Sequence, residues 1–119
     1  MEWKLIDDRP IWLQLTEQLT RKILSGQYAA GERLPSVREL AEEASVNPNT
    51  MQRALSQLEL DGLATSNRTA GRMVTDDAKI IDATRKKLAK KLIDDYLSAM
   101  AHLGYDRAKA AALLKEEEE

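Results

Sequence analysis

The stretch from residue 34 to residue 62, LPSVRELAEEASVNPNTMQRALSQLELDG, constrains the fold more than any other part of this chain. Ser36, followed three residues later by Glu39, predicts a capping box, in which each side chain binds a free backbone N–H at a helix start. Asn47 and Pro48 predict a second start, because Asn is a good N-cap and proline lacks an N–H that would be unpaired there. Only about three residues separate the two helices, which predicts a helix-turn-helix.

The second predicted helix has an apolar face and a polar face. At about 100° per residue, the apolar side collects the four residues Met51, Ala54, Leu55 and Leu58. The opposite side collects Asn49, Gln52, Arg53 and Ser56. Asn and Gln can pair with adenine and Arg with guanine, so this face is predicted to read DNA bases. On the pattern alone, the alternative is an ordinary helical hairpin with a solvated polar face.

Two short strands are predicted directly after this motif, over residues 63–66 and 72–75, around a turn at residues 67–71. A hairpin in this position is typical of a wing that contacts phosphates or the minor groove. Arg68 at the tip and Arg72 on the returning strand favour a wing over a structural hairpin with incidental arginines. The expected fold is mainly α: an N-terminal winged helix-turn-helix with a small β-hairpin wing, followed by two C-terminal helices.

A helix is also predicted before the motif, over residues 10–25, with Gly26 as its stop. Its apolar stripe is formed by Trp12, Leu15, Leu19 and Ile23. Leu13 and Leu24 lie on a different face, where they are either half-exposed or part of a second packing surface.

After the hairpin, Thr75 or Asp76 can cap a long helix to about Leu103, and Asp106 can cap a last one. The long helix carries an apolar stripe whose members are Ile81, Leu88, Leu92, Tyr96, Met100 and Leu103. Two such helices are too small for a core of their own, so they should pack on the first helix, on a second copy, or both. We therefore expect a DNA-binding domain over residues 1–75 and a helical dimerisation region with an acidic tail over residues 76–119.

Composition limits the other functions. The chain has 119 residues, a net charge of −2, no Cys and a single His, His102, late in an amphipathic helix. No paired carboxylates and no glycine-rich phosphate loop stand out, so we expect no enzyme, no catalytic residues, no cofactor and no metal site. No apolar run is long enough to span a membrane, and a cytoplasmic protein is expected. Lysines 86, 87, 90 and 91 could bind DNA or an anion, but their spacing to Asp94 and Asp95 favours a solvated face.

Many residues at ordered spacing resemble the GntR family of bacterial transcription regulators. They include Pro10-Ile11, Gln14, residues 23–26, Gly31, the LPS-x-R-x-LA run from Leu34, VNPNT from Val46, Arg53-Ala54, LE-x-DGL from Leu58, and residues 71–74. The short two-helix end resembles the YtrA subfamily. The resemblance implies a winged helix-turn-helix repressor that dimerises through its C-terminal helices. YtrA-like regulators are often encoded beside genes for membrane transporters, so control of transporter genes is expected. It places Arg38 at a phosphate or the groove edge, the recognition positions at residues 49, 50, 52 and 53, and the wing tip near Arg68.

The chain departs from the family at a few positions. Some members carry Arg at the places of Pro48 and Gln52, so their operator sequence cannot be transferred. The usual glycine-rich wing tip reads Arg68-Thr69-Ala70-Gly71, and Trp12 replaces the usual Tyr. Two alternatives stay open. One is the first module of an aminotransferase-like regulator, for which the chain stops early; the other is a helical interaction adaptor that has lost DNA binding.

The sequence thus predicts a homodimer with two recognition helices in successive major grooves of a near-palindromic operator. The predicted base contacts are Asn49, Gln52 and Arg53. The predicted contacts to phosphates or the groove edge are Ser36, Arg38, Asn47, Thr50 and Ser56, and those of the wing are Arg68, Thr69 and Arg72. A small effector between the tail helices near Tyr96, Met100 and His102 is one alternative there, and an apolar dimer core without a pocket is the other.

Overall fold

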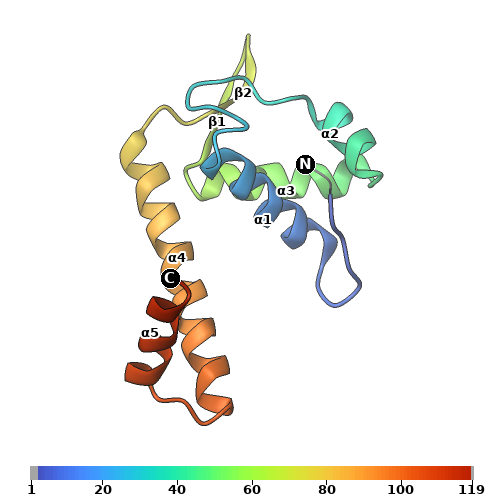
Figure 1. The fold of residues 1–119 in the computed structure, drawn as a ribbon. Helices are drawn as coiled ribbons and strands as arrows, with labels where there is room; N and C mark the ends of the chain where they lie inside the picture. The colour runs from blue at the N-terminus through green and yellow to red at the C-terminus, as the bar shows by residue number, and fades with distance from the viewer. Residues whose placement is uncertain (1–2, 119) are drawn as a thin grey trace. The chain divides into compact units, whose positions relative to one another are not determined.

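The computed structural model describes residues 3–118, which form a mainly helical chain with one β-hairpin (Figure 1). The elements run in the order α1 (Ile11–Leu24), α2 (Val37–Ala44), α3 (Pro48–Leu60), β1 (Ala64–Asn67), β2 (Gly71–Val74), α4 (Ala78–His102) and α5 (Arg107–Glu116). This order confirms the predicted fold class: a helix-turn-helix, a hairpin directly after it, and two C-terminal helices.

The chain divides into two compact units, Met1–Asp82 and Ala83–Glu119, and the division falls inside α4. We call the described residues 3–82 the head and the described residues 83–118 the tail. Residues 1, 2 and 119, which belong to the predicted domain ends, lie outside the described residues. The predicted domain boundary after Thr75 stays a prediction.

The two helices of the motif begin at the predicted caps. The Ser36 hydroxyl accepts a hydrogen bond from the Glu39 N–H at 3.1 Å, and the Glu39 carboxylate accepts one from the Ser36 N–H at 3.2 Å. The Asn47 side chain accepts from the Asn49 N–H at 2.7 Å. Between the helices, Ser45 adopts the left-handed conformation, with φ of 56°, and ends α2. The capping box and the Asn-Pro start are therefore confirmed.

The core of the head lies where α1 and α2 pack against α3 (Figure 1). Its fully enclosed side chains are those of Leu15, Leu19, Leu40, Met51, Ala54, Leu55, Leu58 and Leu63. The apolar face predicted for α3 is thus buried throughout. Val37 is half-buried at the edge of this core, as is Val46 in the turn. Leu13 and Leu24 are both partly buried.

The wing is a two-stranded antiparallel hairpin in which Ala64 pairs with Val74 and Asn67 pairs with Gly71. The first strand begins and ends one residue later than predicted, and the second begins and ends one residue earlier, because the Asn67–Gly71 pair belongs to the ladder. The Asn67 side chain accepts hydrogen bonds from the Thr69 N–H and hydroxyl, both at 2.9 Å, which closes the turn. Gly71 has a φ of 79°, a value that favours glycine.

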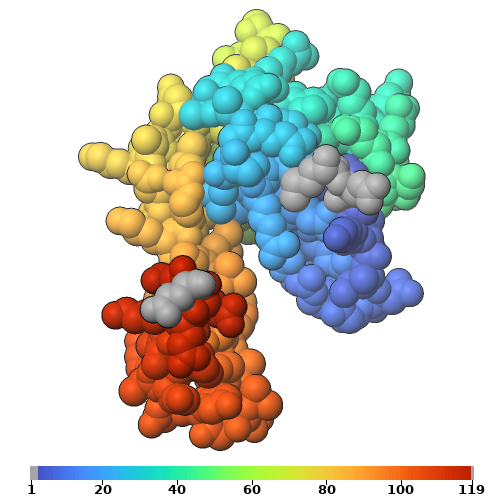
Figure 2. Space-filling view, in the orientation of Figure 1, coloured from blue at the N-terminus to red at the C-terminus, as the bar shows by residue number. Residues whose placement is uncertain are grey.

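The loop before α2 holds the base of the wing. Arg33 forms a single bridge with Met73, and the Leu34 N–H donates to the Arg72 carbonyl at 2.9 Å. Figure 2 shows this loop, in cyan, against the base of the yellow-green hairpin. Backbone contacts among three chain segments, the loop before α2 and the two strands, therefore hold the base of the wing.

The cap of α4 differs from the prediction. Asp77, and not Thr75 or Asp76, accepts the hydrogen bond of the first turn, from the Lys79 N–H at 2.9 Å. The Thr75 hydroxyl instead accepts from the Asp77 N–H at 3.1 Å and so supports the turn that leads into the helix. Thr75 is buried at the end of the wing, which leaves the cap to an exposed neighbour.

The tail has little interior of its own. Ala110 is the only residue of the described tail that is fully buried. The Tyr96 hydroxyl donates to the Ala110 carbonyl at 2.8 Å and joins α4 to α5. As predicted, Asp106 caps α5, and the ion pairs Lys90–Asp94 and Lys91–Asp95 lie on an exposed face. Over residues 3–118, no helix combines the length and the apolar character needed to cross a membrane.

Candidate nucleic-acid interface

The exposed face of α3 carries the side chains that were predicted to read bases. Asn49, Gln52 and Arg53 are all exposed, while the opposite side of the same helix is enclosed by the core. Thr50 and Ser56 are half-buried at the edges of this face. Since α3 is fixed by Met51, Leu55 and its neighbours, its backbone is held and only the exposed side chains can adapt to a ligand.

Arg53 does not simply extend into solvent. Its guanidinium carbon lies 4.2 Å from the centroid of the Trp12 ring, which belongs to the first turn of α1. This distance is that of a cation–π stack. The sequence assigned Trp12 to the apolar stripe of α1, yet its ring is half-exposed and serves as a surface for the arginine. The periodicity of α1 gave no sign of this contact, because it joins two helices.

A groove of about 340 Å³ lies between α2 and the wing. Its wall includes Arg33, Ser36, Ser66 and Arg72. Arg33 is exposed there, beside the N-terminus of α2, and Arg38 is exposed in the first turn of that helix. Arg33 was not among the predicted contact residues.

A polar cluster fixes the wing to the recognition helix. Glu59, near the end of α3, accepts a hydrogen bond from the Ser66 hydroxyl of β1 and one from Arg72 Nε of β2, the latter at 2.9 Å. The Ser66 hydrogen bond, followed by the contact with Arg72, lowers the pKa of Glu59 against the opposing effect of burial. Ser66 and Arg72 are register partners, so one carboxylate holds both strands. Arg72 therefore positions the wing, whereas Arg68 and Thr69 are exposed at the tip.

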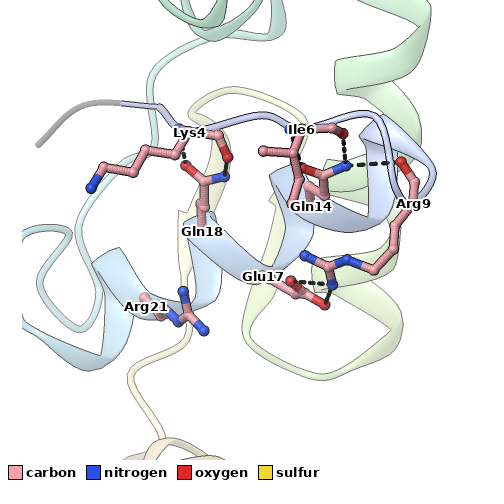
Figure 3. A pocket seen from close by; sticks show the side chains of 7 residues that line it. All are labelled: Lys4, Ile6, Arg9, Gln14, Glu17, Gln18 and Arg21. Atoms are coloured by element: carbon pink, nitrogen blue, oxygen red, sulfur yellow. Dashed lines mark hydrogen bonds and ion pairs between the residues drawn. The ribbon is translucent and has the colours of Figure 1, made fainter.

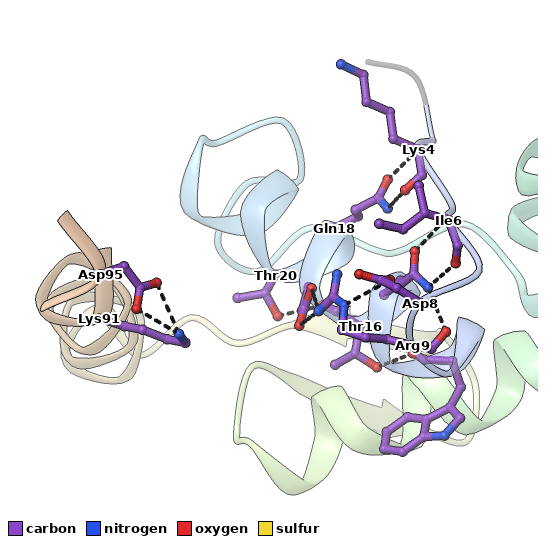
Figure 4. Close-up of polar contacts among 12 residues, drawn as sticks. Lys4, Ile6, Asp8, Arg9, Thr16, Gln18, Thr20, Lys91 and Asp95 are labelled. Carbon is purple, nitrogen blue, oxygen red and sulfur yellow. Dashed lines mark hydrogen bonds and ion pairs between the residues drawn. The ribbon is translucent and has the colours of Figure 1, made fainter. Parts of the chain in front are cut away.

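Two glutamines of α1 bind the N-terminal arm, residues 3–9, to the head (Figure 3). The Gln14 side chain, 1 % exposed, accepts from the Ile6 N–H and donates to the Ile6 and Arg9 carbonyls, all at 2.7–2.8 Å. One turn on, Gln18 makes a similar pair of bonds with Lys4 (Figure 4). The shallow hollow beside this arm, of about 660 Å³, is lined largely by groups that bond one another, so it is no separate binding site.

The arm also covers a buried lysine. The Lys22 ammonium lies 3.7 Å from the Trp3 ring centroid and 5.7 Å from that of Tyr28, and only 1 % of this residue is exposed. Burial lowers the pKa of Lys22, while the charge of Glu43 opposes that change. Lys22 thus packs the arm onto α1 and does not contribute to the exposed positive charge of the head.

Within residues 3–118, there is no group of three His, Asp or Glu side chains that could hold a metal ion. His102 is exposed, with Nδ1 at 2.8 Å from the Ser98 carbonyl.

Comparison with known proteins agrees with this geometry. The model of the family described as bacterial regulatory proteins, gntR family, matches residues 12–74. The HTH-type transcriptional regulator YhcF of Bacillus subtilis is 33% identical over 104 residues, covering 87% of this chain and 86% of that protein. The HTH-type transcriptional repressor YtrA of the same organism is 39% identical over 70 residues, covering 59% and 54%.

The similarity extends to solved structures. A GntR family transcriptional regulator from Listeria monocytogenes superposes with a TM-score of 0.87 at 36% identity, covering 94% of this chain and 98% of that one. The family match, the relatives and the fold are those of regulators and not of enzymes. The chain belongs to the gntR family of bacterial regulatory proteins and is a DNA-binding transcription regulator with a winged helix-turn-helix.

Proposed function

We propose that this regulator is a cytoplasmic homodimeric repressor that binds a near-palindromic operator. In this proposal the two copies of α3 enter successive major grooves, about one helical turn apart. The observation that carries it is the single exposed polar face of α3, with Asn49, Gln52 and Arg53 opposite a wholly enclosed apolar face. Repression and control of transporter genes are proposed from the likeness to proteins such as the repressor YtrA.

The contacts divide into those that read sequence and those that set position. We assign the bases to Asn49, Gln52 and Arg53, and the phosphates or groove edge to a set around the two helix starts: Ser36, Arg38, Asn47, Thr50 and Ser56. The caps support this assignment, because they use the Ser36 hydroxyl and the Asn47 side chain as acceptors. The hydroxyl proton and the amide N–H groups stay available as donors for a phosphate oxygen.

The wing is proposed to contact DNA through its tip, by Arg68 and Thr69. Arg72 contributes by holding the hairpin on α3 through Glu59, at 2.9 Å. We add Arg33 to the phosphate contacts, since it is exposed in the groove between the wing and α2. A DNA backbone that follows α3 and the wing together passes this groove.

The dimer is proposed to form through the tail. The predicted apolar stripe of α4, which begins at Ile81 in the last residues of the head, continues through the tail with Leu88, Leu92, Tyr96, Met100 and Leu103. Leu92 is 64 % exposed and Leu103 is 73 % exposed, although both are apolar. Ile93 and Leu114 are exposed as well and add to the apolar surface that a partner would bury. A second copy of the tail supplies an equally apolar surface, and a two-fold pair of heads suits a palindrome.

The test begins with a randomised duplex library, from which the unaltered chain enriches its preferred sequence. Fluorescence anisotropy then compares the enriched duplex with a scrambled one across a salt series. We expect tight binding to the enriched duplex, with a steep salt dependence. Equal, weak binding to both duplexes would instead support the adaptor that has lost DNA binding.

Two substitutions separate the proposed roles. Arg53→Ala should cost about 1–3 kcal/mol on the enriched duplex and relax the sequence preference. Arg38→Ala should weaken binding to all sequences alike and lower the salt slope. Arg107→Ala, which removes an exposed arginine of α5, is the matched control and should change neither. An equal loss on both duplexes for Arg53→Ala would remove that residue from the base contacts.

A further inference from the structure

We infer that Trp12 is a specificity-determining residue, because its indole ring positions the Arg53 guanidinium for base recognition. The inference rests on the proposed role of Arg53 and extends it to α1, a helix whose residues are otherwise assigned no part in reading DNA. It is carried by the stack itself, with the guanidinium carbon 4.2 Å from the ring centroid.

A stack of this kind leaves the guanidinium ready to bind. The group is planar and its N–H donors lie in that plane, so an aromatic ring against one face leaves the donating edge uncovered. Within residues 3–118, Arg53 forms no hydrogen bond or ion pair, and the residue is exposed. Its donors are therefore available for the O6 and N7 acceptors of guanine, the pair that arginine contacts with two bonds.

The ring reduces what binding costs. A free arginine side chain loses much rotamer freedom when it is fixed against a base. Contact with Trp12 removes part of that freedom before DNA arrives, which is preorganisation of the binding group. Asn49 and Gln52 are shorter and need less support, so Arg53 is the member of the reading face for which a platform matters most.

The platform is itself fixed to the recognition helix. The Thr16 hydroxyl donates to the Trp12 carbonyl at 2.8 Å and lies 3.4 Å from the carbonyl of Ala54, the residue next to Arg53. Thr16 is 5 % exposed, and its neighbours Leu15 and Ala54 are enclosed. One buried hydroxyl thus bonds to the backbone that carries the ring and packs against the backbone that carries the guanidinium.

The experiment is a double-mutant cycle with the full chain. The proteins are the unaltered chain, Trp12→Leu, Arg53→Met and the double variant, with Trp12→Tyr as the conservative replacement. The probes are the duplex enriched from the randomised library by the unaltered chain and the scrambled duplex of the same length. Leucine keeps an apolar side chain in α1, and methionine keeps the stem of Arg53, so each change removes one partner of the stack.

We expect Trp12→Leu to weaken binding to the enriched duplex by about three- to tenfold, the range of the cost of ordering one long side chain on binding. Binding to the scrambled duplex should change by less than about twofold, and Trp12→Tyr should restore the enriched-duplex affinity to within about twofold. In the Arg53→Met background, Trp12→Leu should have no further effect. Thermal unfolding of each variant verifies that the head is folded.

A second measurement observes the stack without DNA. A ring above the guanidinium shifts the NMR signal of the Arg53 Nε–H upfield, and Trp12→Leu should abolish this shift while Trp12→Tyr keeps one. Absence of the shift in the unaltered chain would overturn the inference.

The results distinguish this inference from the proposed function. If Arg53→Met relaxes sequence preference but Trp12→Leu acts equally with and without Arg53, the base contact survives and the positioning role of Trp12 is overturned. If Arg53→Met leaves the preference intact, both the base contact and the inference fall. If the library yields no enriched sequence, both the proposed sequence-specific binding and this inference are overturned.

Discussion

The head and the tail of this regulator differ in how much of their apolar surface they bury. In the head, three helices and the base of the wing enclose a continuous aliphatic core from Leu15 to Val74. In the described tail only Ala110 is fully buried, while leucines such as Leu92 and Leu103 are exposed. Since burial of apolar surface is the main stabilising term, we expect the head to be stabilised mainly by its own core, and we propose that the tail gains stability by packing on a second copy. The described head therefore has a core of its own, whereas the described tail exposes most of its apolar side chains.

The largest expected effect is in the core of the head. Leu55→Ala should reduce the free energy of unfolding by about 2–5 kcal/mol, because it leaves a cavity beneath the recognition helix. Urea denaturation at low protein concentration measures this loss. Leu114→Ala, at an exposed position of the tail, is the control and should change the transition of the head by less than about 0.5 kcal/mol. Equal losses would contradict the contrast between the two units.

The next effect concerns the tail. Leu92→Glu should weaken self-association at least about tenfold, because it places a charge where the proposed partner copy packs. Sedimentation equilibrium measures the dissociation constant, and the dependence of the unfolding temperature on protein concentration should disappear in parallel. Leu60→Glu replaces an exposed leucine of the head and should leave association unchanged. If both variants behave alike, the tail is not the dimer interface.

A smaller effect is expected at the N-terminal arm. Gln14→Leu removes three hydrogen bonds to Ile6 and Arg9 and should cost about 1–3 kcal/mol of head stability. Hydrogen exchange of the Ile6 amide should become much faster, because that N–H loses its acceptor. Gln18→Leu, whose bonds to Lys4 are exposed, should cost less. A slow Ile6 amide in the Gln14 variant would show that packing alone holds the arm.

The smallest expected effect is the pH dependence that polar contacts give to stability, compared between the two units. The folded-state pKa of Glu59 lies below its ordinary value of 4.5, chiefly through the Ser66 hydrogen bond. Its carboxylate therefore stabilises the head fully above that ordinary value, and the contribution is lost as the pH falls through the lowered pKa. The unaltered chain and Glu59→Gln should differ in unfolding free energy at neutral pH and converge in acid.

The matched change in the tail is Asp95→Asn, which breaks the exposed pair with Lys91 (Figure 4). Such pairs contribute about 0.3–0.5 kcal/mol, so this variant should show almost no pH-dependent difference in helix content by circular dichroism. A gap between the unaltered chain and Glu59→Gln that stays constant down to acid pH would argue against the lowered pKa of Glu59.

Local patterns were enough to predict most of the fold. The capping box of Ser36 and Glu39 and the Asn47-Pro48 start each involve neighbours in sequence, and both occur as expected. The apolar positions of α3 are buried because their period follows from the helix itself. The errors are also local: the cap of α4 falls on Asp77, two residues after Thr75, because three consecutive residues there can all accept a hydrogen bond.

The sequence by itself determined the elements of this protein, their order, the winged helix-turn-helix and the exposed polar face of α3. Caps and periodicity act over a few residues, so they can be read from the chain. Only the tertiary structure decided which side chains meet across elements: Trp12 beneath Arg53, Glu59 between Ser66 and Arg72, and Gln14 against the arm. These contacts join residues 5 to 41 positions apart, which lie on separate elements, and their distances exist only after the core has brought those elements together.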